Sequence, residues 1–237
     1  MRGGTITSLI AIRHSHPTLP SPVRPQVNSP AILRDIPREL RTERLTLRCP
    51  REGDGIRVHE AVVESLAALR AWPASLPWAL AEPSRDASET FCRESAARFI
   101  ERTMLVYLAF DPDGLFVAST SLHNIDWAIP KFEIGFWCRT SRQRQGLMTE
   151  AVRKLLDHAT GELHAKRVGA LTDEKNLASR AVCLSAGMRL EGVLRNERRS
   201  PTGELRNTCV YATVRDEDRS LHQANTKARM ASRKRKE

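Results

Sequence analysis

The chain has 237 residues, 41% of them hydrophobic, which fits one domain with further segments at its ends. This composition excludes a chain that is disordered throughout, and no apolar run approaches the roughly 20 residues needed to span a bilayer. The five cysteines are an odd number without a C-x-x-C pair, so we expect neither a disulfide framework nor a metal site. Such cysteine usage fits a reducing cytoplasm, and the lack of a long apolar run fits a protein that does not enter the membrane.

The formal net charge of +10 is concentrated at the two ends of the chain. Residues 1–34 carry four arginines and no acidic residue, and residues 226–237 carry six basic residues and one glutamate. The body of the chain is therefore nearly neutral. Basic ends of this kind can hold RNA, DNA or an acidic surface weakly, with strong salt dependence. The alternative is that they are solvated, disordered termini.

Composition divides the chain into three parts. Residues 1–38 are rich in Pro, Ser and Thr and lack periodicity, which predicts a disordered basic leader. Within the leader, residues 6–12 weakly imitate a signal peptide, and the lack of acidic residues also resembles an organelle transit peptide. We expect one folded domain over residues 39–215 and a basic disordered tail over residues 216–237.

The first half of the domain is expected to contain two helices and three strands. Apolar residues recur at helical spacing in the helices and alternate in the first strand. Residues 72–83, with two tryptophans and three prolines, predict a loop, and Asp111-Pro-Asp-Gly114 predicts a hairpin turn because Pro presets φ and Gly accepts a positive φ. In chain order the elements are a strand at 44–48, helices at 54–70 and 86–101, and strands at 105–110 and 115–122.

In the second half, strands and helices alternate. This alternation after an early hairpin predicts a mixed sheet with helices on both faces. The elements are a strand at 132–138, a helix at 148–160, a strand at 167–171, a helix at 177–186, and strands at 189–194 and 205–214.

One segment has the pattern of a phosphate-binding turn. Gln143-Arg-Gln-Gly146-Leu-Met148-Thr-Glu150 follows a strand and begins a helix. A glycine there lets backbone N–H groups approach a ligand, and the positive end of the helix dipole attracts anions. Arg139, Arg142 and Arg144 flank the turn, so a diphosphate would suit it. The alternative is an ordinary basic helix start.

A second segment lies near the following helix. Asn176 is a suitable N-cap for that helix, and Gly187 a suitable terminator. The segment continues as Glu191-Gly192-Val-Leu-Arg195.

Taken in order over roughly residues 38–214, these segments resemble the GNAT superfamily of N-acetyltransferases, and within it the RimJ/RimL-like branch. Residues 40–48 resemble the opening strand of the branch. Gln143-x-x-Gly146-x-Met148 resembles the acetyl-CoA pyrophosphate motif, with Met148 where a small residue is usual. Asn176-x-x-Ser179, followed by Gly187, resembles the later helix.

The resemblance implies an α+β (mixed α/β) fold of the GNAT type. Its mixed, mostly antiparallel sheet is splayed between the fourth and fifth strands, here residues 132–138 and 167–171, and has helices on both faces. Coenzyme A would occupy the gap, and backbone amides near Phe136 and Trp137 would polarise the thioester carbonyl. The resemblance gives these acetyl-CoA-binding residues: Phe136, Trp137, Gln143, Arg144, Gln145, Gly146, Leu147, Met148, Thr149 and Asn176.

Catalysis would then be direct attack of a neutral amine on the thioester. Glu133 is the first candidate for the base, because a half-buried carboxylate facing a cleft would have a raised pKa. Its alternative is an exposed strand residue. Glu197 and His123 are further candidates, and the alternative for each is a surface residue. Ser179 is the candidate acid by the resemblance, and its alternative is a helix residue bonded to its own backbone.

Other residues have possible roles in the same site. Cys183 stands where many GNAT enzymes have a tyrosine acid, and its alternative is packing. Trp72, Trp78 and Trp127 are candidates for the wall of an acceptor pocket, and their alternative is packing in the core.

The function expected from the sequence is transfer of acetyl from acetyl-CoA to an amine, without a metal. The acceptor would be a protein N-terminal α-amine, as in ribosomal proteins, or a small amine. The alternative is a catalytically inactive GNAT-like protein that binds nucleic acid or ribosomes through its basic tails.

Overall fold

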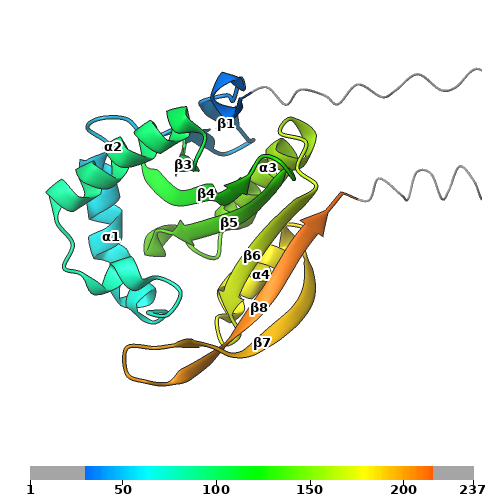
Figure 1. Cartoon of the computed structure of the whole chain (residues 1–237). Coiled ribbons are helices and arrows are strands. Elements are labelled where there is room, and N and C mark those ends of the chain that lie inside the picture. Colours follow the sequence, from blue (N-terminus) through cyan, green and yellow to red (C-terminus); the bar gives the residue numbers. More distant parts are fainter. Residues whose placement is uncertain (1–29, 216–237) are drawn as a thin grey trace, which may run out of the picture.

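The computed structural model describes residues 30–215 of the chain (Figure 1). The first 29 residues of the predicted leader and the predicted tail, residues 216–237, lie outside the described residues. The expectation that these basic ends bind nucleic acid therefore lies outside them too.

Two helices and four strands make up the first part of the described chain. The elements are a short 3₁₀ helix at Ala31–Leu33, β1 (Glu39–Arg41), β2 (Thr46–Arg48), α1 (Gly55–Arg70), a 3₁₀ turn at Pro77–Leu80, α2 (Arg85–Glu101), β3 (Leu105–Phe110) and β4 (Phe116–Asp126). The strand expected at residues 44–48 is present as β2 but begins two residues later, and a further short strand, β1, precedes it. The two strands surround a turn in which Thr42 N donates to the Leu45 carbonyl over 2.9 Å.

The second part alternates strands and helices as expected. The elements are β5 (Lys131–Cys138), a 3₁₀ turn at Thr140–Arg142, α3 (Leu147–Gly161), β6 (Arg167–Asp173), α4 (Leu177–Ser185), β7 (Arg189–Arg199) and β8 (Leu205–Val214).

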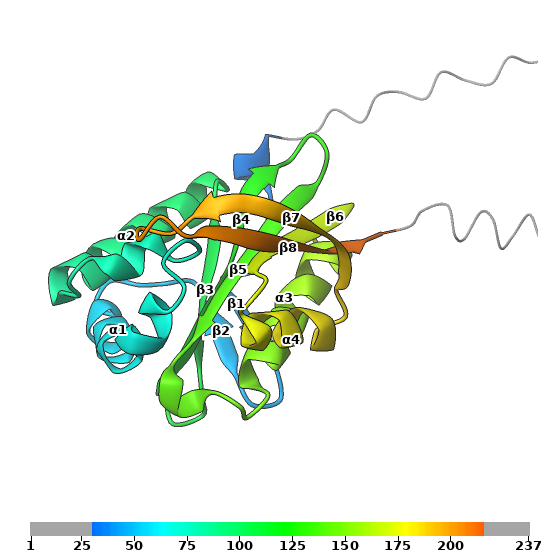
Figure 2. The same cartoon turned by 90° about the horizontal axis from the view of Figure 1, so that it is seen from below.

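All eight strands join one sheet in the order β1-β2-β3-β4-β5-β6-β8-β7. Every neighbouring pair is antiparallel except β5 and β6, which are parallel. Figure 2 shows α1 and α2 on one side of the sheet and α3 and α4 on the other. The predicted fold class, a mixed and mostly antiparallel sheet with helices on both faces, is confirmed.

The sheet opens between β5 and β6. Their pairing begins at Lys131 with Arg167 and ends at Glu133 with Gly169. Beyond these residues the strands continue to Cys138 and Asp173 without pairing, and Figure 1 shows them diverging. The predicted splay is confirmed, although it separates the fifth and sixth strands because β1 precedes the strands that were expected.

A hydrophobic core fills each face of the sheet. On the α1 and α2 face, Val58, Cys92 and Phe116 belong to one buried cluster. A larger cluster includes Leu155 of α3 and Cys183 of α4.

Residues that precede the predicted domain boundary at 39 also pack. Ile36 is buried in the larger cluster, and the Tyr107 hydroxyl donates to the Pro37 carbonyl over 2.7 Å. The packed chain therefore begins several residues earlier than the boundary drawn from composition.

The contact between α1 and α2 requires a glycine at position 55. A Cβ on Gly55 would lie 2.6 Å from both Cα and N of Glu89, so the backbone of α2 would have to move. The Glu89 carboxylate also accepts from Gly55 N over 3.0 Å and from Gly53 N over 2.9 Å. We expect Gly55→Ala to lower the free energy of unfolding by about 1–3 kcal/mol, the usual cost of overpacking.

Urea denaturation measures this change. Gly161→Ala is the matched control, because nothing lies within 4 Å of the Cβ it would add at the end of α3. Equal unfolding midpoints for the two variants would contradict the assigned contact.

Candidate functional site

The predicted phosphate turn lies between the 3₁₀ turn at Thr140–Arg142 and α3. Gly146 is the N-cap of α3 and has φ +77°, in the left-handed region that favours glycine. Arg144, two residues earlier, also has a positive φ of +60°. The chain therefore bends sharply and passes directly into a 15-residue helix.

The N–H groups of this turn are available to a ligand. Within residues 30–215, no hydrogen-bond acceptor is recorded for the backbone N–H groups from Arg144 to Thr149. Unpaired N–H groups and the helix dipole together favour an anion. Apart from Gly146 and its two chain neighbours, Nη2 of Arg44, at 3.5 Å, is the only heavy atom of the described residues that lies within 4 Å of a Cβ placed on Gly146. The turn thus fits the diphosphate of a nucleotide-type ligand.

Arg44 contacts the turn and the first turn of α3, a role that the sequence did not indicate. Its Nη1 donates to the Gln145 carbonyl over 3.0 Å, and its Nε donates to Glu150 over 2.7 Å. Burial would raise the pKa of Glu150, but hydrogen bonds from Thr42 and Arg44 outweigh it and lower that pKa. The ionised carboxylate therefore fixes Arg44 against the turn.

Other side chains near the turn leave it accessible. Met148 is buried in the larger core cluster, so its bulk lies away from the turn. Arg139 pairs with Glu64, and Arg142 pairs with Asp111 over 3.0 Å. Arg144 is exposed, and no ion pair of it is recorded in the described chain, so its charge is available to an anion.

The register of β5 decides which backbone groups face the gap. Arg139 N donates to the Val117 carbonyl over 2.9 Å, which fixes the alternation of hydrogen bonds between β4 and β5. The N–H and C=O groups of Phe136 then point toward β6, where no strand pairs with them. Those of Trp137 point toward Ser119 on β4.

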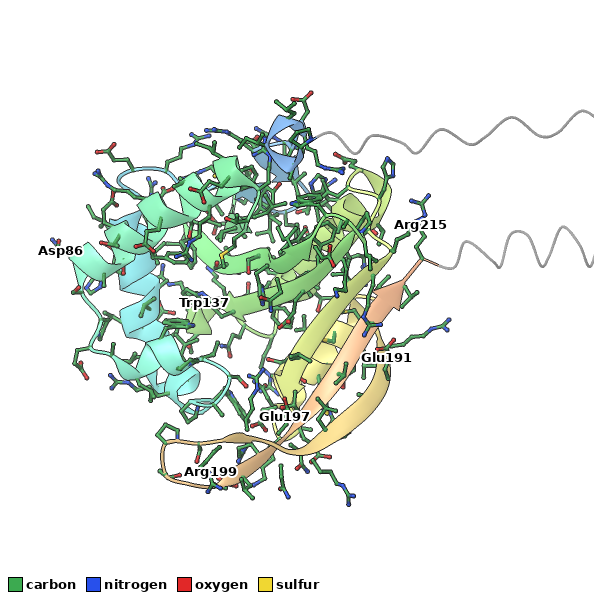
Figure 3. The ribbon with its side chains drawn as sticks, in the orientation of Figure 1. Asp86, Trp137, Glu191, Glu197, Arg199 and Arg215 are labelled. Atoms are coloured by element: carbon green, nitrogen blue, oxygen red, sulfur yellow. The ribbon has the colours of Figure 1, made fainter. Side chains whose placement is uncertain are left out.

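Trp137 is therefore wrong as a backbone donor to the gap. Its ring instead packs on the α1 and α2 face, with centroids 5.4 Å from Phe116 and 6.1 Å from Trp78. Figure 3 shows Trp137 between β5 and α1.

Asn176 and Ser179 lie where β6 ends and α4 begins. Asn176 Oδ1 accepts from Ser179 N over 3.0 Å, so the predicted cap is confirmed. The Ser179 hydroxyl is half-buried and has no hydrogen-bond partner among the described residues, so it is not bonded to its own helix. Cys183 is fully buried in the core, where burial raises the pKa of its thiol to about 12. Its surroundings fit packing.

Glu133 differs from the expectation for a base. Its Oε1 lies 3.3 Å from His123 Nε2, and its Oε2 accepts from Asn124 Nδ2 over 3.0 Å. The hydrogen bond from His123 is the largest influence and lowers the pKa of Glu133, although burial opposes it. The predicted raised pKa is wrong, because these partners stabilise the charged form more than burial destabilises it.

The side chains of His123 and Glu133 lie on the α1 and α2 face. Residues 133, 135 and 137 share one face of β5 by strand alternation, and Trp137 packs against α1 on that face. Glu133 and Asn124 also line a cavity of about 160 Å³ at the point where β5 and β6 part.

The hairpin of β7 and β8 meets the loop after α1 near this face. Arg198 Nη1 donates to the Ala74 carbonyl over 3.3 Å, and the charge of Arg198 contributes to the lowered pKa of Glu133. Glu197 is exposed on the same hairpin, as Figure 3 shows, and lines an open depression of about 750 Å³.

The three predicted wall tryptophans separate. Trp78 contacts Trp137 and remains 47% exposed, and Trp72 is half-buried in the loop after α1. Trp127 packs against Phe132 and donates to the Arg102 carbonyl over 2.9 Å, at the closed end of the splay. Trp127 therefore has the alternative role expected for these tryptophans, core packing, beside β5.

Three properties of the described chain bear on cofactors and location. Residues 30–215 contain no group of three or more His, Cys, Asp or Glu side chains that could hold a metal ion. None of the helices in this range combines the length and hydrophobicity that crossing a membrane requires. All five cysteines are free thiols.

Two curated proteins of Bacillus subtilis (strain 168) are similar in sequence. "Putative ribosomal N-acetyltransferase YdaF" is 38% identical over 84 residues, 35% of this chain and 46% of that protein. "Probable N-acetyltransferase YjcK" is 34% identical over the same length, with the same coverage. The chain thus matches about half the length of these curated relatives.

Solved structures share the fold over most of the chain. RimL, a ribosomal L7/L12 α-N-protein acetyltransferase in complex with coenzyme A, has a TM-score of 0.67 at 23% identity, covering 74% of this chain and 96% of that chain. The microcin C7 self-immunity acetyltransferase MccE, in complex with acetyl-CoA and AMP, has a TM-score of 0.66 at 22% identity, covering 73% and 94%.

A family assignment follows from the sequence itself. Residues 44–189, more than half of the chain, match the family described as "Acetyltransferase (GNAT) domain". The matched range includes both the turn at Gly146 and the splay between β5 and β6. The chain belongs to the GNAT acetyltransferase family.

Proposed function

We propose that the chain is an N-acetyltransferase that moves acetyl from acetyl-CoA to an amine. The observation that carries this proposal is the row of unpaired N–H groups from Arg144 to Thr149 at the start of α3. These N–H groups follow the open segment of β5 along the chain, in the connection from β5 to α3 and in the first turn of α3. A diphosphate at the turn and an extended thiol arm along β5 match these two features.

Acetyl-CoA supplies an activated thioester, so the protein has to bind it, orient the amine and handle protons. Orientation contributes most, because well-placed groups reach very high effective molarities. The Phe136 N–H, which faces the gap, is suited to polarise the thioester carbonyl. The free hydroxyl of Ser179 is suited to protonate the departing thiolate, which leaves readily because thiols have a pKa of about 8.5.

The proposed acceptor is the α-amine of a protein N-terminus. An α-amine has a pKa of about 8, so roughly 10% is neutral at pH 7, whereas a lysine amine near 10.4 is almost fully charged. YdaF is described as a putative ribosomal N-acetyltransferase and RimL as a ribosomal L7/L12 α-N-protein acetyltransferase, which supports a protein N-terminus as the acceptor. A small amine is the alternative acceptor.

We also propose a cytoplasmic location, which the five free thiols support.

Thiol release from acetyl-CoA tests the proposal. Purified protein is given N-terminal peptides, lysine side-chain peptides with blocked N-termini, and small amines such as polyamines. We expect release that depends on a free α-amine, with acetylation of that amine visible by mass spectrometry. Acetyl-CoA binding without turnover on any acceptor would contradict enzyme function and favour an inactive ribosome- or nucleic-acid-binding protein.

A further inference from the structure

We propose that His123, rather than Glu133, accepts the proton of the acceptor amine, with Ser121 as a relay and Glu133 as the positioning residue. This assignment rests on the proposed function and deepens it. It follows from a row of three side chains on β4 and β5, on the face that also carries α1 and α2.

The three side chains form a continuous path. His123 Nδ1 lies 3.4 Å from Ser121 Oγ, and His123 Nε2 lies 3.3 Å from Glu133 Oε1. Ser121 and His123 are two residues apart on β4, so they point to the same face, and His123 is directly opposite Glu133 in the β4–β5 register.

Glu133 determines which nitrogen of His123 is basic. Its lowered pKa keeps the carboxylate ionised, so it accepts the Nε2 proton and is itself a poor base at neutral pH. The proton on Nε2 leaves the lone pair on Nδ1, which faces the Ser121 hydroxyl. A positive charge formed on the imidazole is then stabilised by the adjacent carboxylate.

A glycine on β5 makes room for the ring. A Cβ on Gly135 would lie 3.1 Å from Cε1 and 3.6 Å from Nδ1 of His123. Gly135 comes after the last pairing of β5 with β6, so the basic edge of His123 lies over the open segment of β5. Phe136, the next residue, offers the free N–H proposed to hold the thioester carbonyl.

The charged groups around His123 favour this role. Glu133 faces it from β5, and Arg198 on β7 is near enough to contribute to the lowered pKa of Glu133. Asn124, the neighbour on β4, binds the second carboxylate oxygen of Glu133 over 3.0 Å. Glu133 is thus held at both oxygens and cannot easily turn away from His123.

Each proton and electron pair of the reaction has a destination. An N–H bond of the acceptor ammonium breaks, its proton passes to Ser121 Oγ, and the hydroxyl proton of Ser121 passes to His123 Nδ1. The electron pair stays on nitrogen and forms the C–N bond, while the C–S bond breaks and its pair leaves with sulfur. A second proton, lost from nitrogen after attack, neutralises the thiolate, and His123 returns its proton to water.

Steady-state kinetics of His123→Gln with an α-amine peptide at several pH values test the assignment. We expect kcat at pH 7 to fall about 100-fold or more, the usual contribution of a general base, with acetyl-CoA affinity unchanged within twofold. The loss should shrink at pH 9.5, because the acceptor amine, with a pKa of about 8, is then already neutral. A purely structural role for His123 would give an equal loss at both pH values.

Two further variants complete the experiment. Glu133→Gln should show the same pH signature with a smaller loss, and it decides the question if His123→Gln does not fold. His164→Asn, at an exposed histidine with φ +56°, is the control and should keep wild-type kinetics. If the wild-type protein turns over and His123→Gln keeps a kcat within threefold of it, the assignment of His123 is wrong and the proposed function stands. If the wild-type protein shows no turnover, the proposed function and the assignment are both wrong.

Discussion

Gly146→Glu is expected to weaken acetyl-CoA binding by at least about 100-fold, or ~2.8 kcal/mol. The new carboxylate would lie at the N-terminus of α3, beside the unpaired N–H groups proposed to bind the diphosphate of acetyl-CoA. Its negative charge would repel that diphosphate. A side chain at φ +77° is also strained, which adds a modest loss of stability. Isothermal titration calorimetry with acetyl-CoA measures the affinity.

The control for Gly146→Glu separates strain from the loss of the anion site. Gly203 lies in the β7–β8 turn with φ +87°, and nothing lies within 4 Å of its missing Cβ. Gly203→Glu therefore carries the same backbone strain and the same charge away from α3. It should lose similar thermal stability and keep its acetyl-CoA affinity. Equal affinities for both variants would show that the turn does not bind the diphosphate.

Asp54→Ala is expected to lower the free energy of unfolding by about 3–5 kcal/mol, the cost of breaking a buried ion pair. Asp54 is 3% exposed and accepts two hydrogen bonds from Arg48, at 2.6 and 2.7 Å. It also accepts from Arg51 N over 2.8 Å. The variant would leave Arg48 unpaired above the ring of Phe110, 4.3 Å away, with its side chain only 13% exposed.

Urea denaturation of Asp54→Ala beside Glu39→Gln measures the effect. Glu39 pairs with Arg41 at the surface, where the arginine side chain is 75% exposed, so its loss should cost less than about 1 kcal/mol. The same destabilisation in both variants would mean that the pair between Arg48 and Asp54 adds no more than a surface contact.

The long elements of the fold could be predicted from the sequence because their patterns repeat. α1, α2 and α3 have 15 residues or more, which is several helical turns of apolar spacing. β1 has only three residues, too few for an alternation to be recognised, and the pattern at residues 44–48 predicted β2 alone. Their separation depends on the Thr42–Leu45 turn, which carries no strong local signal.

The candidate site could be predicted only where it is local in sequence. The turn at Gly146 and the cap at Asn176 each lie within one short segment, so each could be predicted from the residues of that segment. The ion pair between Arg44 and Glu150, which supports the turn, joins residues 106 positions apart and therefore has no local pattern in the sequence. The contact between His123 and Glu133 depends on the β4–β5 register, so the lowered pKa of Glu133 could not be foreseen.

The edge of β5 toward which each backbone N–H group points could not be predicted from the sequence either. Neighbouring residues in a strand point their N–H groups to opposite edges, and composition does not reveal which edge each residue takes. The bond from Arg139 N to Val117 resolves this and assigns the open edge to Phe136.

The most direct test of the account is an NMR titration of ¹⁵N-labelled protein with acetyl-CoA. We predict that the largest amide shift changes fall on Arg144 to Thr149 and on Phe136, because their N–H groups gain acceptors. Saturable binding that leaves these amides unshifted, with the changes gathered elsewhere on the molecule, would contradict the placement of acetyl-CoA in the splayed sheet.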